Sequence, residues 1–174
     1  YLPYTVELGR AFVQPDYQPG NNLRKGLYSL DNLWDGLGGI ILCNPEMRYF
    51  FGKATIYPSF GMTEFTMIEG FMNKYFEDSN HLIFPKKPMK LEGTEEISRI
   101  FDGANFKEDY IILKRELKNK GKNIPPLVNA YMTLSPSMKV FGVAINDEFG
   151  DVYETGLMID INDIYEEKKA RHLI

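Results

Sequence analysis

Residues 6–22 of the chain read VELGRAFVQPDYQPGNN and change character half-way along. The first half alternates as a strand does: one face holds Glu7, Gly9, Ala11 and Val13, and the other holds Leu8, Arg10 and Phe12. Proline, glycine and asparagine residues then break the pattern over residues 15–22. The stretch therefore predicts a strand that ends in a turn with many free backbone N–H groups.

The hydrophobic period changes after this turn. Large apolar residues recur at helical spacing over residues 25–43, which predicts a helix there. An aromatic and β-branched run predicts the next strand at 48–58. A second helix is predicted at 62–76, with Thr63 as its N-cap.

The second half of the chain begins with helices and ends with a hairpin. The predicted elements are a short strand at 81–84, helices near 94–101, 107–119 and from 124 onward, strands at 138–146 and 152–161, and a helical end at 165–173. Strands thus alternate with helices early and pair with each other late. The expected fold class is α/β (α+β), with one mixed sheet flanked by helices in a single domain over residues 1–174.

The composition bounds the class of protein. The 174 residues are 44% hydrophobic with a net charge of −4, which suits a globular domain and argues against a nucleic-acid binder. No apolar run approaches the roughly 20 residues of a membrane span. The single cysteine, Cys43, excludes an internal disulfide and is predicted to be buried and inert; a cytoplasmic protein is expected. His81 and His172 lack the spacing of metal ligands, so no metal site is predicted.

The turn and the helix after it have the features of a phosphate site. Backbone N–H groups at a helix N-terminus converge on an anion. Arg24 and Lys25 add positive charge, and Gly20 and Gly26 allow close approach of the backbone. A surface loop with two solvated cations explains the same composition, and the residues themselves leave both interpretations open.

The segment ELGRAFVQPDYQ, residues 7–18, resembles the fourth strand and pyrophosphate loop of the GNAT superfamily of N-acyltransferases. It is most similar to the branch of ornithine-lipid and glycine-lipid N-acyltransferases, often labelled hemolysin-like. Its E-L-x-R element is also similar to one in acyl-homoserine-lactone synthases. Residues 30–39, 49–58 and 124–161 resemble later parts of the lipid branch. The resemblance implies a GNAT-like fold, of which this chain is the C-terminal part without the N-terminal strands.

The resemblance also implies an activity. Members of this branch move a long acyl chain from an acyl carrier protein or coenzyme A thioester to the amine of a small amino acid such as glycine or ornithine, in aminolipid biosynthesis. The amine attacks directly, with no covalent enzyme intermediate and no metal. The implied partners are an acyl carrier protein and the amino-acid acceptor, with peripheral contact to the inner face of the membrane as an option and no nucleic acid.

The family's functional residues map onto the first strand and its loop. Glu7 corresponds to the base that deprotonates the amine, or to part of a water relay, and its structural alternative is a charge that pairs with a neighbour across the sheet. A backbone N–H near Phe12 or Val13 is expected to face the thioester oxygen. The phosphates of the donor are expected to contact Gln18, Gly20, Arg24, Lys25 and Gly26. After Gln18 the loop is longer than the usual family pattern, which favours a carrier protein over coenzyme A as the donor.

Four further residues keep a structural alternative. Arg10 corresponds to a charge that helps to build the active-site cleft in acyl-homoserine-lactone synthases, or it pairs across the sheet. Tyr131 is either the general acid that protonates the leaving thiolate or a core residue. Asp147 and Glu148 either hold the acceptor amine or form a solvated turn.

Two groups of side chains and the function itself also keep alternatives. The aromatic and methionine residues of 62–76 line an acyl tunnel or form plain core. The cations of residues 86–90 and 114–120 dock an acidic carrier protein or anionic lipid, or they are solvated. The alternative functions are a non-catalytic domain that binds an acyl thioester or carrier protein, and an acetyl-coenzyme-A-dependent N-acetyltransferase of small molecules.

Overall fold

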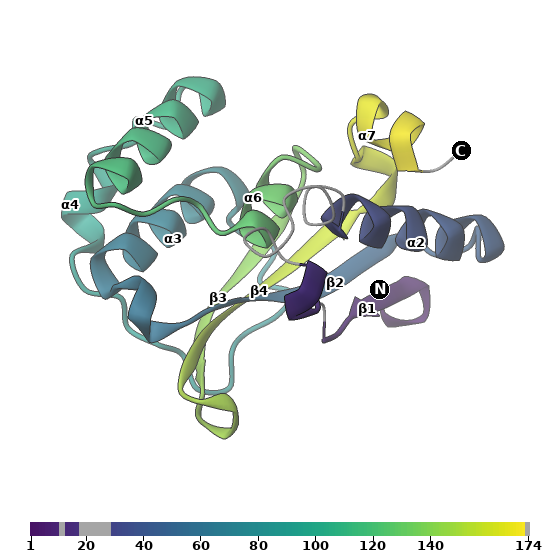
Figure 1. Cartoon of the computed structure of the whole chain (residues 1–174), viewed down its shortest axis with the longest axis horizontal. Coiled ribbons are helices and arrows are strands. Elements are labelled where there is room, and N and C mark those ends of the chain that lie inside the picture. Colours follow the sequence, from purple (N-terminus) through teal and green to yellow (C-terminus); the bar gives the residue numbers. More distant parts are fainter. Residues whose placement is uncertain (11–12, 18–28, 173–174) are drawn as a thin grey trace.

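The computed structural model describes residues 1–10, 13–17 and 29–172, and it confirms a mixed sheet flanked by helices. Four strands form the sheet in the order β1-β2-β4-β3 (Figure 1). Their bounds are Thr5–Leu8 for β1, Tyr49–Ile56 for β2, Lys139–Asn146 for β3 and Val152–Asp160 for β4. β1 runs parallel to β2, and the other two neighbouring pairs are antiparallel.

The helices gather on one side of this sheet (Figure 1). Their bounds are Ser29–Cys43 for α2, Met62–Phe76 for α3, Thr94–Ser98 for α4, Phe106–Asn119 for α5, Pro126–Met132 for α6 and Glu166–His172 for α7. α2 lies in the connection between β1 and β2, because two parallel strands need a long crossover that a hairpin turn cannot supply.

The alternation of β2 fixes which face of the sheet the helices cover. Phe50, Ala54 and Ile56 are buried, whereas Lys53 between them is exposed. On β1, Val6 and Leu8 pack against the same core. Side chains at the alternate positions therefore point to the opposite, more open face.

Helix α3 supplies the centre of the core. Its Phe65, Ile68 and Phe71 are fully buried. The Phe71 ring lies 5.4 Å, between centroids, from each of the rings of Phe101 and Phe106. Offset and edge contacts of this kind stabilise a core beyond the area they bury. The aromatic stripe of this helix is plain core, the second of the two predicted alternatives.

The first strand is shorter than predicted. The alternation carries it to Val13, but β1 ends at Leu8. Arg10 has a φ of 57°, in the left-handed region that an extended strand does not contain. The prediction of a strand that continues through Arg10 is therefore wrong, and the opposite faces expected for Glu7 and Arg10 on one strand do not apply.

Three local predictions also differ from the structure. Gly61, not Thr63, is the N-cap of α3. Residues 81–84 form no strand, and His81 has a φ of 52° there. Cys43 was predicted to be buried, but it is exposed at the end of α2. The predicted helical stripe fits the side of α2 that faces the core, which includes the buried Trp34. The last residues of that helix are exposed.

Candidate active site

The two parallel strands separate at one point of the sheet. β1 and β2 pair from Thr5 opposite Tyr49 to Leu8 opposite Gly52. β2 then continues to Ile56 with β4 on its other side. Within the described ranges 1–10, 13–17 and 29–172, no strand lies beside residues 53–56 on the side of β1. Beyond Gly52, the described residues therefore pair with the backbone of β2 on the β4 side alone.

Glu7 stands immediately before this fork, on the open face of the sheet. It lies opposite Phe51 in the parallel pair and is exposed. Its neighbours Val6 and Leu8 pack against the core, so the Glu7 side chain points away from the helices. A carboxylate in this position remains accessible to a substrate amine.

Tyr131 reaches the same fork from the helical face. It comes from α6 and is 2% exposed. A β-carbon at Gly52 would lie 3.4 Å from the Tyr131 hydroxyl oxygen and 3.3 Å from the Leu8 β-carbon, so the glycine leaves the space that the hydroxyl occupies. The indole of Trp34 packs edge-on against the tyrosine ring, with centroids 5.7 Å apart.

The Tyr131 hydroxyl is chemically available. No hydrogen bond joins it to another residue in the described part of the chain. Burial raises the pKa of Tyr131 to about 12, so the phenol keeps its proton at neutral pH. A neutral phenol in a dry position can donate a proton to a group that becomes strongly basic during a reaction.

The remaining residues predicted on the first strand and its loop are only partly described. Arg10 is exposed, and no ion pair or hydrogen bond joins it to another residue of the described ranges. Val13 is half-buried. The predicted contacts of Phe12, Gln18, Gly20, Arg24, Lys25 and Gly26 lie outside the described residues.

The predicted acceptor residues lie at the other side of the sheet. Asp147 and Glu148 form the turn between β3 and β4. β3 is three strand positions from β1, roughly 14 Å at the usual strand spacing. The Asp147 carboxylate accepts a 2.8 Å hydrogen bond from Lys87, and this lysine lowers the pKa of Asp147. The structure does not bring this turn to Glu7 and Tyr131, and its solvated alternative fits the observed exposure.

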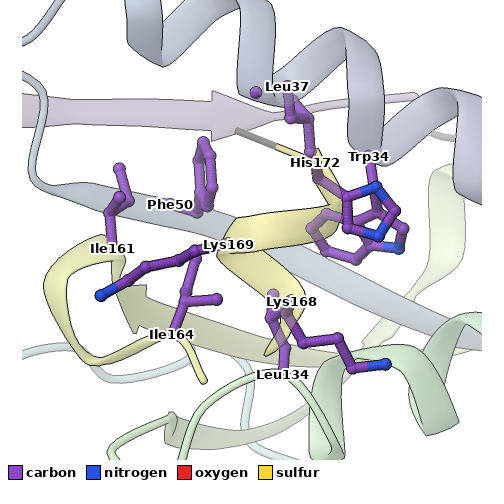
Figure 2. Close-up of a pocket in the computed structure, with 10 residues that line it drawn as sticks. Trp34, Leu37, Phe50, Leu134, Ile161, Ile164, Lys168, Lys169 and His172 are labelled. Atoms are coloured by element: carbon purple, nitrogen blue, oxygen red, sulfur yellow. The ribbon is translucent and has the colours of Figure 1, made fainter. Parts of the chain in front are cut away.

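An apolar hollow opens on the helical face beside Trp34 (Figure 2). Side chains from α2, β2, the turn after α6 and the C-terminal segment line it, among them Trp34, Leu37, Phe50, Leu134 and Ile164. Figure 2 shows Lys168 and His172 around the same hollow. Because Trp34 contacts both this hollow and Tyr131, the apolar wall begins one side chain away from the phenol.

One ionisable residue in the core was not among the predicted site residues. Glu69 of α3 is fully buried, and its Oε1 accepts a 2.5 Å hydrogen bond from the Thr155 hydroxyl. Its Oε2 has no partner in the described part of the protein. Burial raises the pKa of Glu69 to about 7. The signal was present in the sequence, since residue 69 stands four residues after Phe65 and three before Met72, on the core stripe of the helix.

Replacement of Glu69 by glutamine is expected to change how stability depends on pH. The folded-state pKa of about 7 lies above the ordinary 4.5, so between these values the folded state holds a proton that the unfolded state has lost. The stability of the wild type therefore falls as pH rises through this interval, by roughly 3 kcal/mol. The amide does not titrate, and its oxygen still accepts from Thr155.

Urea unfolding of both proteins at pH 5 and pH 8 measures this effect. Between pH 5 and pH 8 the unfolding free energy of the wild type is expected to fall, relative to that of Glu69→Gln, by roughly 3 kcal/mol. A difference that stays constant with pH would show that Glu69 does not titrate in the core.

No helix in the described ranges combines the length and the apolar character of a membrane span. Among the same residues, no group of three or more His, Cys, Asp or Glu side chains is placed to hold a metal ion.

Comparison with known proteins gives a direct lead to the chemistry. The chain is 53% identical to a glycine N(alpha)-acyltransferase of Phocaeicola vulgatus over 174 residues. A glycine N(alpha)-acyltransferase of Bacteroides thetaiotaomicron is 52% identical over the same length. Each alignment covers 99% of this chain, which spans about half the length of these two glycine N(alpha)-acyltransferases. No protein-family model and no solved structure matches the chain.

Proposed function

We propose that this chain forms the catalytic part of an N-acyltransferase that moves a long acyl chain from a thioester to the amine of glycine. The observation that carries the proposal is the 53% identity, over 99% of the chain, to a protein named glycine N(alpha)-acyltransferase. The fork between β1 and β2 supports it, because a carboxylate and a neutral phenol lie at one point of the sheet.

The two side chains suit the two proton transfers of the reaction. Glycine arrives as an ammonium and must lose a proton before its nitrogen can attack. In the proposed reaction Glu7 accepts this proton, directly or through a water molecule. The nitrogen then attacks the thioester carbonyl carbon and the C–N bond forms. The attacking nitrogen releases its second proton to solvent, and the C–S bond breaks. Tyr131 gives its proton to the departing thiolate, and the proton held by Glu7 restores the phenol through solvent.

The placement of acid and base on opposite faces supports this order of events. The attacking amine and the departing sulfur occupy different sides of the tetrahedral carbon. A thioester that lies along the open edge of β2 beyond Gly52 meets the Glu7 face on one side and the Tyr131 face on the other. The open backbone N–H groups of that edge would then be available to the carbonyl oxygen.

The surface beside Trp34 gives an acyl chain apolar contacts, since Leu37, Phe50 and Ile164 line a small hollow next to the ring that contacts Tyr131. Each methylene buried against such a surface contributes about 0.8 kcal/mol to binding. The hollow itself has room for about one water molecule, so the preference for a long chain rests on the resemblance of the sequence to the lipid branch. The product would be an N-acyl glycine, a precursor of an aminolipid.

A defined assay tests this function. Purified protein is incubated with glycine and with thioesters of increasing chain length, on coenzyme A and on an acyl carrier protein, and the products are identified by mass spectrometry. N-acyl glycine that forms faster from long-chain than from acetyl thioesters is the expected result. Faster transfer of acetyl groups would replace the proposal with a small-molecule acetyltransferase, and thioester binding without turnover would favour a non-catalytic binding domain.

A further inference from the structure

Helix α5 and the turn after it carry a charge opposite to that of the whole chain. Residues 110–124 contain five cations and a single acid, Glu116, although the net charge of the protein is −4. Three of the cations, Lys114, Arg115 and Lys118, line a hollow that also includes Tyr110 and Asn129 of α6. The local field of this surface therefore attracts anionic partners despite the overall negative charge.

Two of the three cations of this hollow have no acid partner in the described structure, whereas Arg115 binds Glu116 at 3.1 Å. In the described part of the chain, no carboxylate lies within ion-pair distance of Lys114 or Lys118. The Lys114 Nζ lies 5.5 Å from the centroid of the Tyr110 ring, a cation–π contact that stabilises the ammonium without neutralising its charge. Elsewhere on the surface, Lys53 binds Glu154 at 2.7 Å and Lys87 binds Asp147 at 2.8 Å.

An exposed apolar side chain stands inside the group of cations. Ile111 is 63% exposed and lies one helical turn before Lys114 and Arg115, on the outer side of α5. It is the large hydrophobic residue that this helix leaves open to solvent in the described structure. An apolar centre with a charged surround is the usual composition of a protein docking site.

We propose that this face of α5, with its hollow, docks an acidic acyl carrier protein that presents the thioester to the fork; the proposal rests on the function proposed above. The charges of Lys114, Arg115 and Lys118 complement an acidic helix, and Ile111 provides the apolar contact. Complementary charge of this kind raises the rate of encounter and fixes the orientation of the partner.

The position of α6 connects the docking face to the reacting atoms. Asn129 lines the hollow and accepts a hydrogen bond from the Tyr110 hydroxyl. Tyr131, two residues later on the same helix, lies with its hydroxyl against Gly52 at the fork. An α-helix with its side chains is about 10–12 Å wide. The flexible arm of a docked carrier protein would therefore need to extend past the width of α6 to bring the thioester to Tyr131.

The shape of the surface favours a protein over a membrane as the occupant. An interfacial helix lies on lipid through a continuous apolar face. The outer side of α5 instead offers one apolar residue, Ile111, among charged ones, and the cations line a concavity that also includes the amide of Asn129. A hollow with both charge and amide groups accommodates a convex acidic helix better than a flat array of headgroups.

Binding of a carrier protein without an acyl chain tests the docking surface independently of catalysis. The full protein is titrated into fluorescently labelled carrier protein, and anisotropy gives the Kd. The double variant Lys114→Glu with Lys118→Glu is expected to weaken binding about tenfold or more, and the weakening is expected to shrink at high salt. The matched control, Lys86→Glu with Lys90→Glu, makes the same charge change on the exposed segment after α3 and is expected to keep the Kd within about twofold of the wild type.

Activity with two donors completes the test. The α5 variant is expected to lose kcat/KM with the acyl carrier protein and to keep it with the same acyl chain on coenzyme A. Equal losses in the two charge-reversal variants, or a loss with both donors, would overturn the proposal. So would binding to vesicles of anionic lipid in place of the carrier protein.

The outcomes also separate this proposal from the proposed function. Carrier binding that depends on Lys114 and Lys118, without turnover from either donor, would keep the docking surface and reject the transferase activity. Turnover from coenzyme A thioesters without any binding of the carrier protein would keep the activity and overturn the docking surface. Circular dichroism of each variant verifies that the exposed substitutions leave the fold intact.

Discussion

Glu7→Gln is expected to lower kcat for N-acyl glycine formation by a factor of roughly 10² to 10⁴. The amide has the same shape as the carboxylate but cannot accept the proton of the glycine ammonium. Glu7 is exposed on β1, opposite Phe51, and packs little surface, so the variant is expected to fold as the wild type does. The loss should diminish at high pH, where more of the free glycine is already deprotonated.

A carboxylate on the same open face provides the control. Glu154 of β4 binds Lys53 at 2.7 Å and lies opposite Thr55, two strands from β1. Glu154→Gln removes an ion pair close to the surface, which is worth about 1 kcal/mol or less, and kcat should remain unchanged. Steady-state kinetics of both variants from pH 6 to pH 10 measures the contrast. Full activity in Glu7→Gln would remove this residue from the chemistry.

Tyr131→Phe is expected to lower kcat about a hundredfold and to leave stability almost unchanged. The phenol is the proposed proton donor to the thiolate, and phenylalanine retains the ring that packs against Trp34. Because the hydroxyl forms no hydrogen bond within the described structure, its removal leaves no described partner unsatisfied. A thioester with a more acidic thiol needs less help from an acid and is expected to recover part of the rate.

Tyr75→Phe is the matched control for this variant. The Tyr75 hydroxyl donates a 2.6 Å hydrogen bond to Asp109, a buried carboxylate that also accepts from the backbone N–H of Gly103. Its loss is expected to lower the free energy of unfolding by about 1–3 kcal/mol without an effect on kcat. Urea unfolding and kinetics on both variants distinguish the roles. Equal kcat in Tyr131→Phe and wild type would leave Tyr131 a core residue.

Much of the fold could be predicted because local patterns and tertiary structure agree. The aromatic run of β2 and the stripe of α3 both bury the residues that the spacing predicts. The helix predicted at 107–119 ends where expected, and Gly121 just after its last turn has a φ of 71°, a conformation that glycine adopts readily. The turn of Asp147–Phe149 joins β3 and β4 as the hairpin pattern indicates.

The errors lie where tertiary contacts override the local pattern. Alternation continues past Leu8 in the sequence, but the left-handed Arg10 ends the strand, and no periodicity reveals that conformation. Glu69 occupies a core position of α3, and a test for charged residues on the predicted stripe would have found it. Cys43 ends an apolar helix, yet the exposure of a helix end depends on which face meets the sheet.

The sequence offered residues for the candidate site but not its geometry. The resemblance assigned Glu7 and offered Tyr131, whose roles stay predictions. Only the tertiary structure brings the Tyr131 hydroxyl to Gly52, because α6 and β2 are more than seventy residues apart in the sequence. The same contact explains why a glycine interrupts the large side chains of β2.

The two edge strands of the described sheet, β1 and β3, differ in whether a further strand can pair with them. Along β3 the edge is closed, since Glu77 and Pro88 form bridges to it and the backbone N–H of Met89 donates to Val143. Along β1 no described residue plays this part. In the described structure, a strand from elsewhere in the polypeptide, or from another molecule, can therefore extend this sheet on the β1 side but not beside β3. Such an extension would enclose Glu7 and make its basicity depend on how the sheet is completed.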